Sequence, residues 1–163
     1  MAGIVVAKKG RPVLFNITNQ LPNKQLIPID LTINAGPNTT VGDLPLNRIA
    51  THLHGGFTPW FSDGIPFQWF APNGMHGVSF MNVPGTNPSA GTATYYYPMD
   101  QSARMAWYQD HAVGIMRTNA YSRIASPLVL TDDFPEAAGF HGRPDEPQDR
   151  RPRVRVALPH PGT

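Results

Sequence analysis

Two histidines separated by one residue lie in the stretch THLHGG, residues 51–56. Residues i and i+2 of a strand point to the same face, so His52 and His54 would present two imidazoles about 6–7 Å apart along the strand. Gln109 and His111 have the same spacing in the stretch WYQDHAVG. Imidazole binds copper, zinc, iron and nickel, copper(II) most tightly, whereas an amide oxygen is a poorer ligand for these metals. The two pairs indicate a metal site in which Gln109 is the weak member.

Strands are the elements that must position these pairs. Runs rich in β-branched and aromatic residues are separated by Gly, Pro and Asn, and no helical period of apolar residues is present. The aromatic-rich loop 57–76 is expected to be ordered and functional, because a long loop in a compact domain usually is. About eight strands are predicted, over residues 3–10, 11–19, 26–33, 48–56, 77–83, 92–98, 103–111 and 125–133.

The composition agrees with an all-β protein. The chain has 163 residues, with 18 prolines, 15 glycines and only 15% charged residues. Many short strands with turns between them predict a Greek-key β-sandwich or barrel. Beyond residue 133 the sequence becomes rich in Pro, Arg, Gly and acids, although RVRVAL is compatible with a short strand. We therefore expect one domain over residues 1–133 and a C-terminal extension over residues 134–163.

The chain contains no cysteine. Disulfides, zinc–thiolate sites, iron–sulfur clusters and a cysteine nucleophile are therefore excluded. A blue-copper site is excluded as well, because it requires a thiolate ligand. Any metal site in this chain must therefore lack thiolate ligands.

Charge and hydropathy give little support for nucleic-acid or membrane partners. Residues 1–139 hold eight Lys/Arg and eight Asp/Glu, so the net charge of +2 comes from the extension alone. A solvated or partner-bound tail is the favoured reading of that charge, ahead of nucleic-acid binding. The opening MAGIVVAKKG has no apolar run long enough for a signal peptide or a membrane span. The sequence therefore predicts a cytoplasmic location as expressed and leaves the natural location open.

At the two histidine motifs the sequence resembles a known family. The stretch THLHGGFTPWFSDGIPFQWF, followed by YYYPMDQSARMAWYQDHAVGIMRTNAY, is similar to the first cupredoxin domain of multicopper oxidases, in particular laccase-like and bilirubin-oxidase-like enzymes. The resemblance covers about Ile4 to Asp132. It implies a cupredoxin-like fold and copper as the cofactor.

The resemblance also implies roles for single residues. His52 matches the ligand of the type 2 copper and His54 matches a type 3 ligand. The second family motif is His-Asp-His, so His111 matches another type 3 ligand and Gln109 stands where the family has a ligand. Asp63, in FSDG, matches an acidic residue that assists proton delivery when oxygen is reduced, and it is the candidate catalytic residue.

The sequence also departs from the family. The ligand motifs of the last family domain, including the cysteine of the type 1 copper, are absent, so the route by which substrate electrons reach the cluster is missing. We therefore expect a domain that stands alone as a truncated form, with weak or no oxidase activity. Oxygen and a phenolic or other reducing substrate would be partners only if activity survives.

Such a domain is expected to form homo-oligomers. In the family this domain buries one face against other domains, and an exposed apolar face usually marks an interface. Aromatic residues of the long loop are candidates for that face, and subunits related by symmetry would pool their histidines. The candidates are Phe57, Trp60, Trp69 and Phe70.

Two other functions are compatible with the same residues. Three histidines with one open position describe a zinc site that activates water for hydrolysis or hydration, with Asp63 or Asp110 as the general base. A non-catalytic β-sandwich used for assembly, with vestigial histidines, is the second alternative. Metal content and metal identity distinguish the three readings.

Overall fold

The computed structural model describes residues 3–23, 25–133 and 153–157. Short 3₁₀ turns at Val41–Asp43 and Trp60–Ser62 and one α-helix, α1 (Met116–Tyr121), interrupt a chain that is otherwise strands and loops. The strands are β1 (Val5–Lys8), β2 (Val13–Thr18), β3 (Asn34–Gly36), β4 (Thr39–Thr40), β5 (Thr51–His54), β6 (Thr92–Tyr97), β7 (Arg104–Asp110), β8 (Ala125–Thr131) and β9 (Arg153–Ala157).

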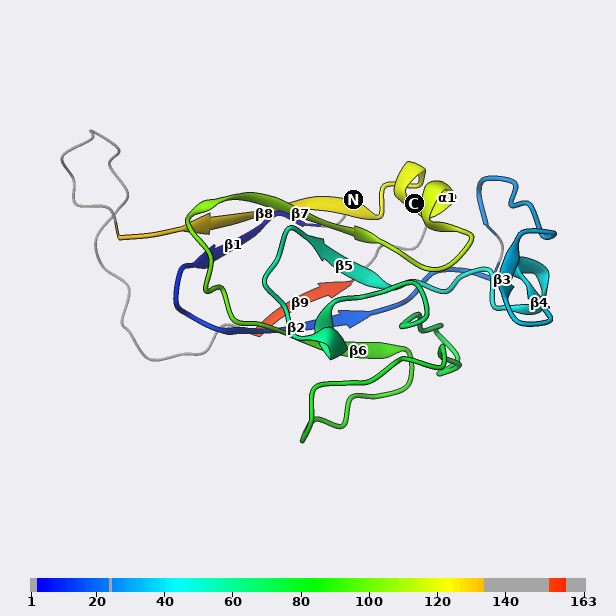
Figure 1. Ribbon diagram of the computed structural model, residues 1–163, viewed down its shortest axis with the longest axis horizontal. Coiled ribbons are helices and arrows are strands. Elements are labelled where there is room, and N and C mark those ends of the chain that lie inside the picture. Colours follow the sequence, from blue (N-terminus) through cyan, green and yellow to red (C-terminus); the bar gives the residue numbers. More distant parts are fainter. Residues whose placement is uncertain (1–2, 24, 134–152, 158–163) are drawn as a thin grey trace.

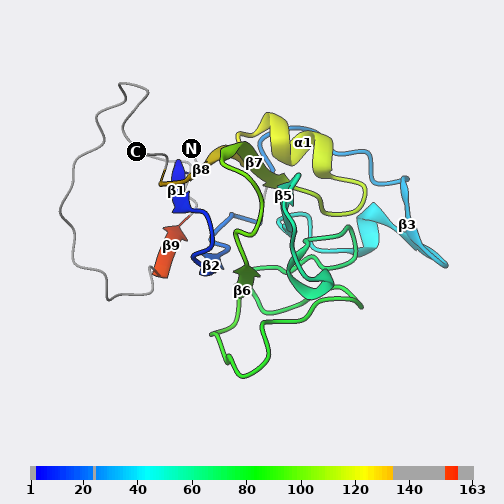
Figure 2. The same ribbon diagram turned by 60° about the vertical axis from the view of Figure 1, so that its left-hand side comes forward.

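Two sheets pack face to face. The first has the strand order β1–β8–β7–β5, and the second has the order β6–β2–β9. Figure 1 shows the first sheet above the second, with the small β3–β4 hairpin and α1 at one end, and Figure 2 shows the same arrangement from the side. The predicted all-β Greek-key sandwich is confirmed.

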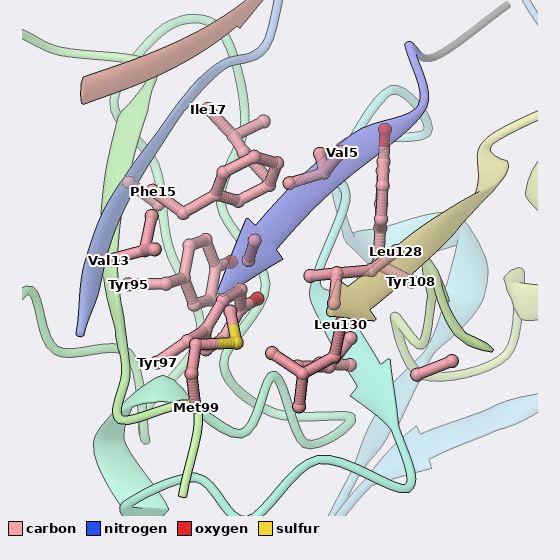
Figure 3. Packing of buried hydrophobic residues seen from close by; sticks show 14 of the residues in the cluster. Val5, Val13, Phe15, Ile17, Tyr95, Tyr97, Met99, Tyr108, Leu128 and Leu130 are labelled. Carbon is pink, nitrogen blue, oxygen red and sulfur yellow. The ribbon is translucent and has the colours of Figure 1, made fainter. Parts of the chain in front are cut away.

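The core lies between the two sheets and follows from the alternation in the sequence. Along β2, the buried residues Val13, Phe15 and Ile17 alternate with partly exposed neighbours, so one side of the strand faces the core. The ring of Phe15 contacts Tyr97 of β6 and Tyr108 of β7, at centroid distances of 5.8 and 5.6 Å. Figure 3 shows these residues filling the space between the layers. This core holds β5 and β7, which carry the histidine motifs, against the second sheet.

Segments far apart in sequence complete both sheets. Strand β1 pairs in parallel with β8, Val5 opposite Leu128. The backbone of β9 pairs in parallel with β2, which confirms a strand within RVRVAL for residues 153–157. The rest of the extension lies outside the described residues. The division into residues 1–133 and 134–163 therefore stays a prediction.

Two predicted strands are absent from the described chain. Residues 26–33 form turns, because the Asp30 side chain accepts hydrogen bonds from the backbone N–H and hydroxyl of Thr32, and β3 begins only at Asn34. Residues 77–83 also form turns: Phe80 N–H donates to Gly77 O, and the side chain of Val78 is 95% exposed. Local hydrogen bonds compete with strand pairing in both segments.

The short helix α1 is an element that the sequence pattern did not predict. It lies beside the end of β7 (Figure 1) and buries Thr118 and Asn119 rather than an apolar stripe. Six residues with polar buried positions give no helical hydrophobic period, so the pattern could not reveal it. Within the described part of the chain, no helix is long and apolar enough to cross a membrane.

Candidate metal centre

Strand β5 presents His52 and His54 on one face. Thr51 and Leu53 point into the core, at 4% and 3% exposure, so the two histidines alternate with them toward the outside. The imidazole centroids of His52 and His54 are 5.9 Å apart. The strand ends at His54, and the following Gly55 has a φ of +78°, in the left-handed region that glycine adopts most easily. The predicted placement of this pair on one strand face is confirmed.

The tautomer of His52 follows from its contact with residue 63. The Nδ1 atom of His52 lies 2.7 Å from the backbone carbonyl oxygen of Asp63. A carbonyl oxygen only accepts, so Nδ1 must carry the hydrogen, and the lone pair of Nε2 remains available for a metal. The Asp63 carboxylate Oδ1 lies 3.4 Å from the same nitrogen. Residue 63 therefore orients the imidazole in the way that outer-shell partners orient metal ligands.

His111 joins this pair from the position directly after the neighbouring strand, β7. Its ring stacks on that of His52, with centroids 4.9 Å apart and an interplanar angle of 24°. Burial lowers the pKa of His111, and the nearby His52 lowers it further, whereas the Gly64 backbone and Asp63 oppose this shift. A lowered pKa keeps the imidazole neutral, which is the form that binds metal. The Nδ1 atom of His111 is buried and makes no hydrogen bond of normal geometry with the described residues.

Gln109 faces the same cluster. In the antiparallel pairing of β5 and β7, Gln109 lies directly opposite His52. Side chains in directly opposed positions share a face, with Cβ atoms about 4.5–5.5 Å apart. Strand β7 ends at Asp110, so His111 follows the strand rather than belonging to it, but the sequence prediction that both residues reach one side of the sheet agrees with this geometry.

The cluster is incomplete as a binding site for one ion. Among residues 3–23, 25–133 and 153–157, no three His, Asp or Glu side chains converge so as to hold a metal ion by themselves. The stacked rings of His52 and His111 place two imidazoles side by side instead of around a shared centre. This geometry does not support the alternative of a self-sufficient three-histidine zinc site, which needs convergent ligands.

The long loop that carries Asp63 is ordered, as predicted. Gln68 donates from its amide to Trp60 O at 2.8 Å, and its side-chain oxygen accepts from Ile65 N–H at 3.0 Å. The hydroxyl of Thr58 donates to Asp63 Oδ1 at 3.1 Å. The side chain of Asp63 remains 34% exposed. Its role as a catalytic residue stays a prediction.

The chain has relatives among laccases and multicopper oxidases. It is 35% identical over 130 residues to a laccase from Bacillus stratosphericus, a match that covers 80% of this chain and 23% of the relative. It is 34% identical over 134 residues to multicopper oxidase LPR1 homolog 1 from Oryza sativa subsp. japonica, covering 82% of this chain and 21% of the relative. The chain thus spans less than a quarter of these relatives. No protein-family model matches it.

Solved structures show the same fold. A laccase-like multicopper oxidase from Ochrobactrum sp. superposes with a TM-score of 0.51 at 19% identity, covering 80% of this chain and 20% of the other. A laccase from Pediococcus acidilactici gives a TM-score of 0.51 at 14% identity, with the same coverage. The chain has the cupredoxin fold of a multicopper oxidase domain.

The residues of the cupredoxin domain could supply some of the ligands of a copper ion. Its multicopper oxidase relatives imply copper as the cofactor. The donors that the domain offers are imidazoles, which suit copper, and the Nδ1 of His111 is buried without a hydrogen bond of normal geometry to the described residues. Without cysteine, no copper–thiolate bond can form in this chain. The three histidines therefore fit as part of a copper centre that needs further ligands.

An apolar face adjoins the histidines of the cupredoxin domain. On the outer side of the β1–β8–β7–β5 sheet, Ile4, Val6, Met105 and Trp107 are 68%, 66%, 69% and 44% exposed. We call these four residues the apolar face. Strand pairing aligns Val6 and Met105 across Val129, and it places Trp107 opposite His54. The face and the histidines thus form one continuous surface.

Two of the aromatic residues proposed for an interface are not available for one. Trp69 and Phe70 are buried, at 5% and 2% exposure, because Phe70 pairs with Ile49 and packs on Phe80 in the core. Phe57 and Trp60 are 66% and 63% exposed, as an interface requires. The prediction was therefore wrong for Trp69 and Phe70.

Sequence reasoning missed the polar network behind the histidines of the cupredoxin domain. Arg48, Asp110 and Asn119 are each 0% exposed and lie beneath the strand ends that carry His52 and His111. Burial raises the pKa of Asp110 to about 7, while hydrogen bonds from Ala50, Asn119 and Ala112 and the charge of Arg48 oppose this. Period-2 alternation along β7 already placed Asp110 on the inner face of the sheet. An acidic residue at an inner position needs buried polar partners, and this was the signal in the sequence that could have revealed the network.

Proposed function

We propose that this cupredoxin domain binds copper through His52, His54 and His111 and that it acts as one part of an oxidase-type copper centre. The observation that supports this most directly is the gathering of the three imidazoles, with His52 at 5.9 Å from His54 and 4.9 Å from His111. The hydrogen bond from His52 Nδ1 to Asp63 leaves Nε2 free for a metal. Imidazole-only coordination favours copper(II) over the other common divalent ions.

In this proposal the copper supplies one-electron redox chemistry, and the residues of the chain position it. The Asp63 carbonyl orients His52, and the partly exposed Asp63 carboxylate holds or transfers a proton beside the cluster. Oxygen as the electron acceptor and a phenolic reductant are proposed from the kinship with laccases. Oxidase activity of this chain is expected to be weak or absent, because no cysteine is present to form the copper–thiolate entry site.

Assembly through the apolar face completes the proposal. The described residues of one copy offer no convergent set of three ligands, and the histidines border exposed apolar residues. The ring of His54 stacks on that of Trp107, with centroids 4.4 Å apart and an interplanar angle of 19°. A second copy that docks on this surface would bring its own imidazoles next to those of the first. Burying an exposed apolar face is the driving force.

A copper titration tests the function. We expect the metal-free chain to bind Cu(II) with an electron paramagnetic resonance spectrum of nitrogen ligation and without the intense visible absorption of a copper–thiolate bond. Zn(II) should compete poorly, because copper stands above zinc in the order of affinities. A chain that retains no Cu(II) after dialysis would refute the proposal and favour the non-catalytic assembly domain. Preferred binding of Zn(II) would favour the hydrolytic alternative.

Phenol oxidation tests whether activity depends on assembly. Any oxidation of a phenolic dye by the copper-loaded chain should fall per chain as the protein is diluted, because only an interface pools ligands from two copies. Sedimentation at the same concentrations reports the oligomer. Constant activity per chain through dissociation to the monomer would show that one domain suffices.

Restoring a histidine at position 109 should strengthen the copper site. The change Gln109→His replaces an amide oxygen by an imidazole nitrogen opposite His52, and imidazole is the better copper donor. We expect tighter Cu(II) binding in a competition titration and an additional nitrogen coupling in the resonance spectrum. Gln101→His is the control, because Gln101 is buried but lies outside the pairing of β5 with β7, and its side chain bonds to Gly55 O and Phe57 N–H. Equal affinity in the Gln109→His variant and the parent would contradict a metal-facing role for position 109.

A charge on the apolar face should disrupt assembly. We expect Met105→Lys to shift the chain toward the monomer in sedimentation velocity, because docking would bury an unpaired ammonium. Val78→Lys adds the same charge at a residue that is 95% exposed on another part of the surface, and it should leave the distribution unchanged. A monomeric parent, or equal shifts in the two variants, would contradict assembly through this face.

A further inference from the structure

The Asp110–His111 dipeptide holds both backbone polar groups of Ala50. The Asp110 carboxylate Oδ1 accepts from Ala50 N–H at 2.8 Å, and the N–H of His111 donates to Ala50 O at 2.7 Å. Ala50 is fully buried and lies two residues before His52. These two hydrogen bonds therefore connect the start of β5 directly to the residue that carries the third imidazole.

The second oxygen of the same carboxylate fastens two more segments. Oδ2 of Asp110 accepts from Asn119 Nδ2 at 3.0 Å and from Ala112 N–H at 3.2 Å. The Asn119 amide also donates to Arg48 O at 3.1 Å. Strand β5, the chain after β7 and helix α1 thus meet at one buried carboxylate.

We infer that Asp110 is a positioning residue, which sets the stacked arrangement of His52 and His111 by holding Ala50, Ala112 and Asn119 around one carboxylate. The two imidazoles lie on the opposite side of the strands from Asp110, so the carboxylate does not touch a metal bound by them. The carboxylate of Asp110 acts through the backbone segments that carry the two rings. The effect of Asp110 on copper binding rests on the proposed function, whereas its effect on the arrangement of the two rings does not.

A purely stabilising role is the competing explanation, because any satisfied buried carboxylate contributes to the fold. Asn19 provides a matched control. It is 3% exposed, and its amide donates to Asn47 O at 2.8 Å and to Phe70 O at 3.1 Å, so it fastens loops without contacting the histidine segments. Loss of either side chain should destabilise the fold, but only loss of Asp110 should move the imidazoles.

The experiment compares Asp110→Ala, Asp110→Asn and Asn19→Ala in two measurements. In the metal-free protein, nuclear Overhauser contacts between the ring protons of His52 and His111 report the stacking. In a competition titration, Cu(II) alone reports affinity. We expect Asp110→Ala to lose the ring contacts and to bind Cu(II) about 10–100-fold more weakly, the usual effect of losing an outer-shell partner. Asp110→Asn keeps one acceptor oxygen and should recover part of both signals, and Asn19→Ala should change neither.

Two outcomes would overturn the inference: unchanged ring contacts in folded Asp110→Ala, or equal losses in Asn19→Ala. If Asp110→Ala does not fold, Asn119→Ala takes its place, because it removes one donor to Oδ2 and leaves the carboxylate. Unchanged ring contacts in that variant would count equally against the inference. A parent protein that does not bind Cu(II) would refute the proposed function, while the ring contacts would still decide the positioning role.

Discussion

Replacing His52, His54 and His111 together by alanine is expected to abolish specific Cu(II) binding. These side chains are the imidazoles that the structure brings together, and each would contribute a coordinate bond. Loss of an outer-shell partner alone weakens metal binding by about 10–100-fold, and loss of the ligands themselves should weaken it further. Isothermal titration with Cu(II), supported by electron paramagnetic resonance, measures the effect. Each single alanine variant should show a large part of this loss of Cu(II) affinity.

His76→Ala is the control for the histidine variants. The ring of His76 packs on Phe80 and interacts with Gly77 O, so it belongs to another part of the surface. Removing it should leave the Cu(II) affinity unchanged. Full copper uptake by the triple variant, or loss of uptake in His76→Ala, would show that the copper site lies elsewhere in the chain.

A methyl group at Gly64 should destabilise the domain strongly. A Cβ atom there would lie 1.9 Å from the backbone oxygen of Thr51 and 2.8 Å from the nitrogen of His52, and φ at this residue is +66°. A left-handed conformation costs a non-glycine residue about 1–2 kcal/mol. Overpacking adds about 1–3 kcal/mol. We therefore expect Gly64→Ala to lower the free energy of unfolding by about 2–5 kcal/mol, measured by urea denaturation.

Gly55→Ala separates the two causes. Gly55 has a similar φ of +78°, but among the described residues, apart from its two chain neighbours, nothing lies within 4 Å of the position of an added Cβ. Only the conformational cost remains there, so this variant should lose about 1–2 kcal/mol. The crowding at Gly64 also acts on the strand that carries His52, and Cu(II) binding should weaken in that variant alone. Similar stabilities of the two variants would mean that the loop can move away from β5.

The fold and the histidine motifs were predictable because they depend on local patterns. Alternation along β2 and β7 places Phe15 and Tyr108 inside, and the i, i+2 spacing places His52 and His54 together outside. The family resemblance of the two motifs added copper and the cupredoxin fold. These features need no knowledge of which distant segments meet.

The buried polar network behind the histidine motifs was not predictable, because it depends on contacts between segments that are distant in sequence. Arg48 is fully buried although arginine is seldom buried, and its guanidinium donates to Pro45 O and Val113 O, which lie on separate segments. Residues 26–33 have a strand-like composition, but the Asx turn of Asp30 prevails because none of the described strands pairs with them. Tertiary context decided both cases.

The parallel pairing of β1 with β8 also determines when the sandwich can form. Val5 and Leu128 are 123 positions apart in sequence, yet their strands lie side by side in the first sheet. A ribosome must therefore synthesise nearly the whole cupredoxin domain before this sheet can acquire its outer strand. Chains dominated by such distant contacts fold over milliseconds to seconds, because loop-closure entropy is lost before the contacts form. During that interval β8 has an unpaired edge, and nascent chains that collide at high expression levels would aggregate through it.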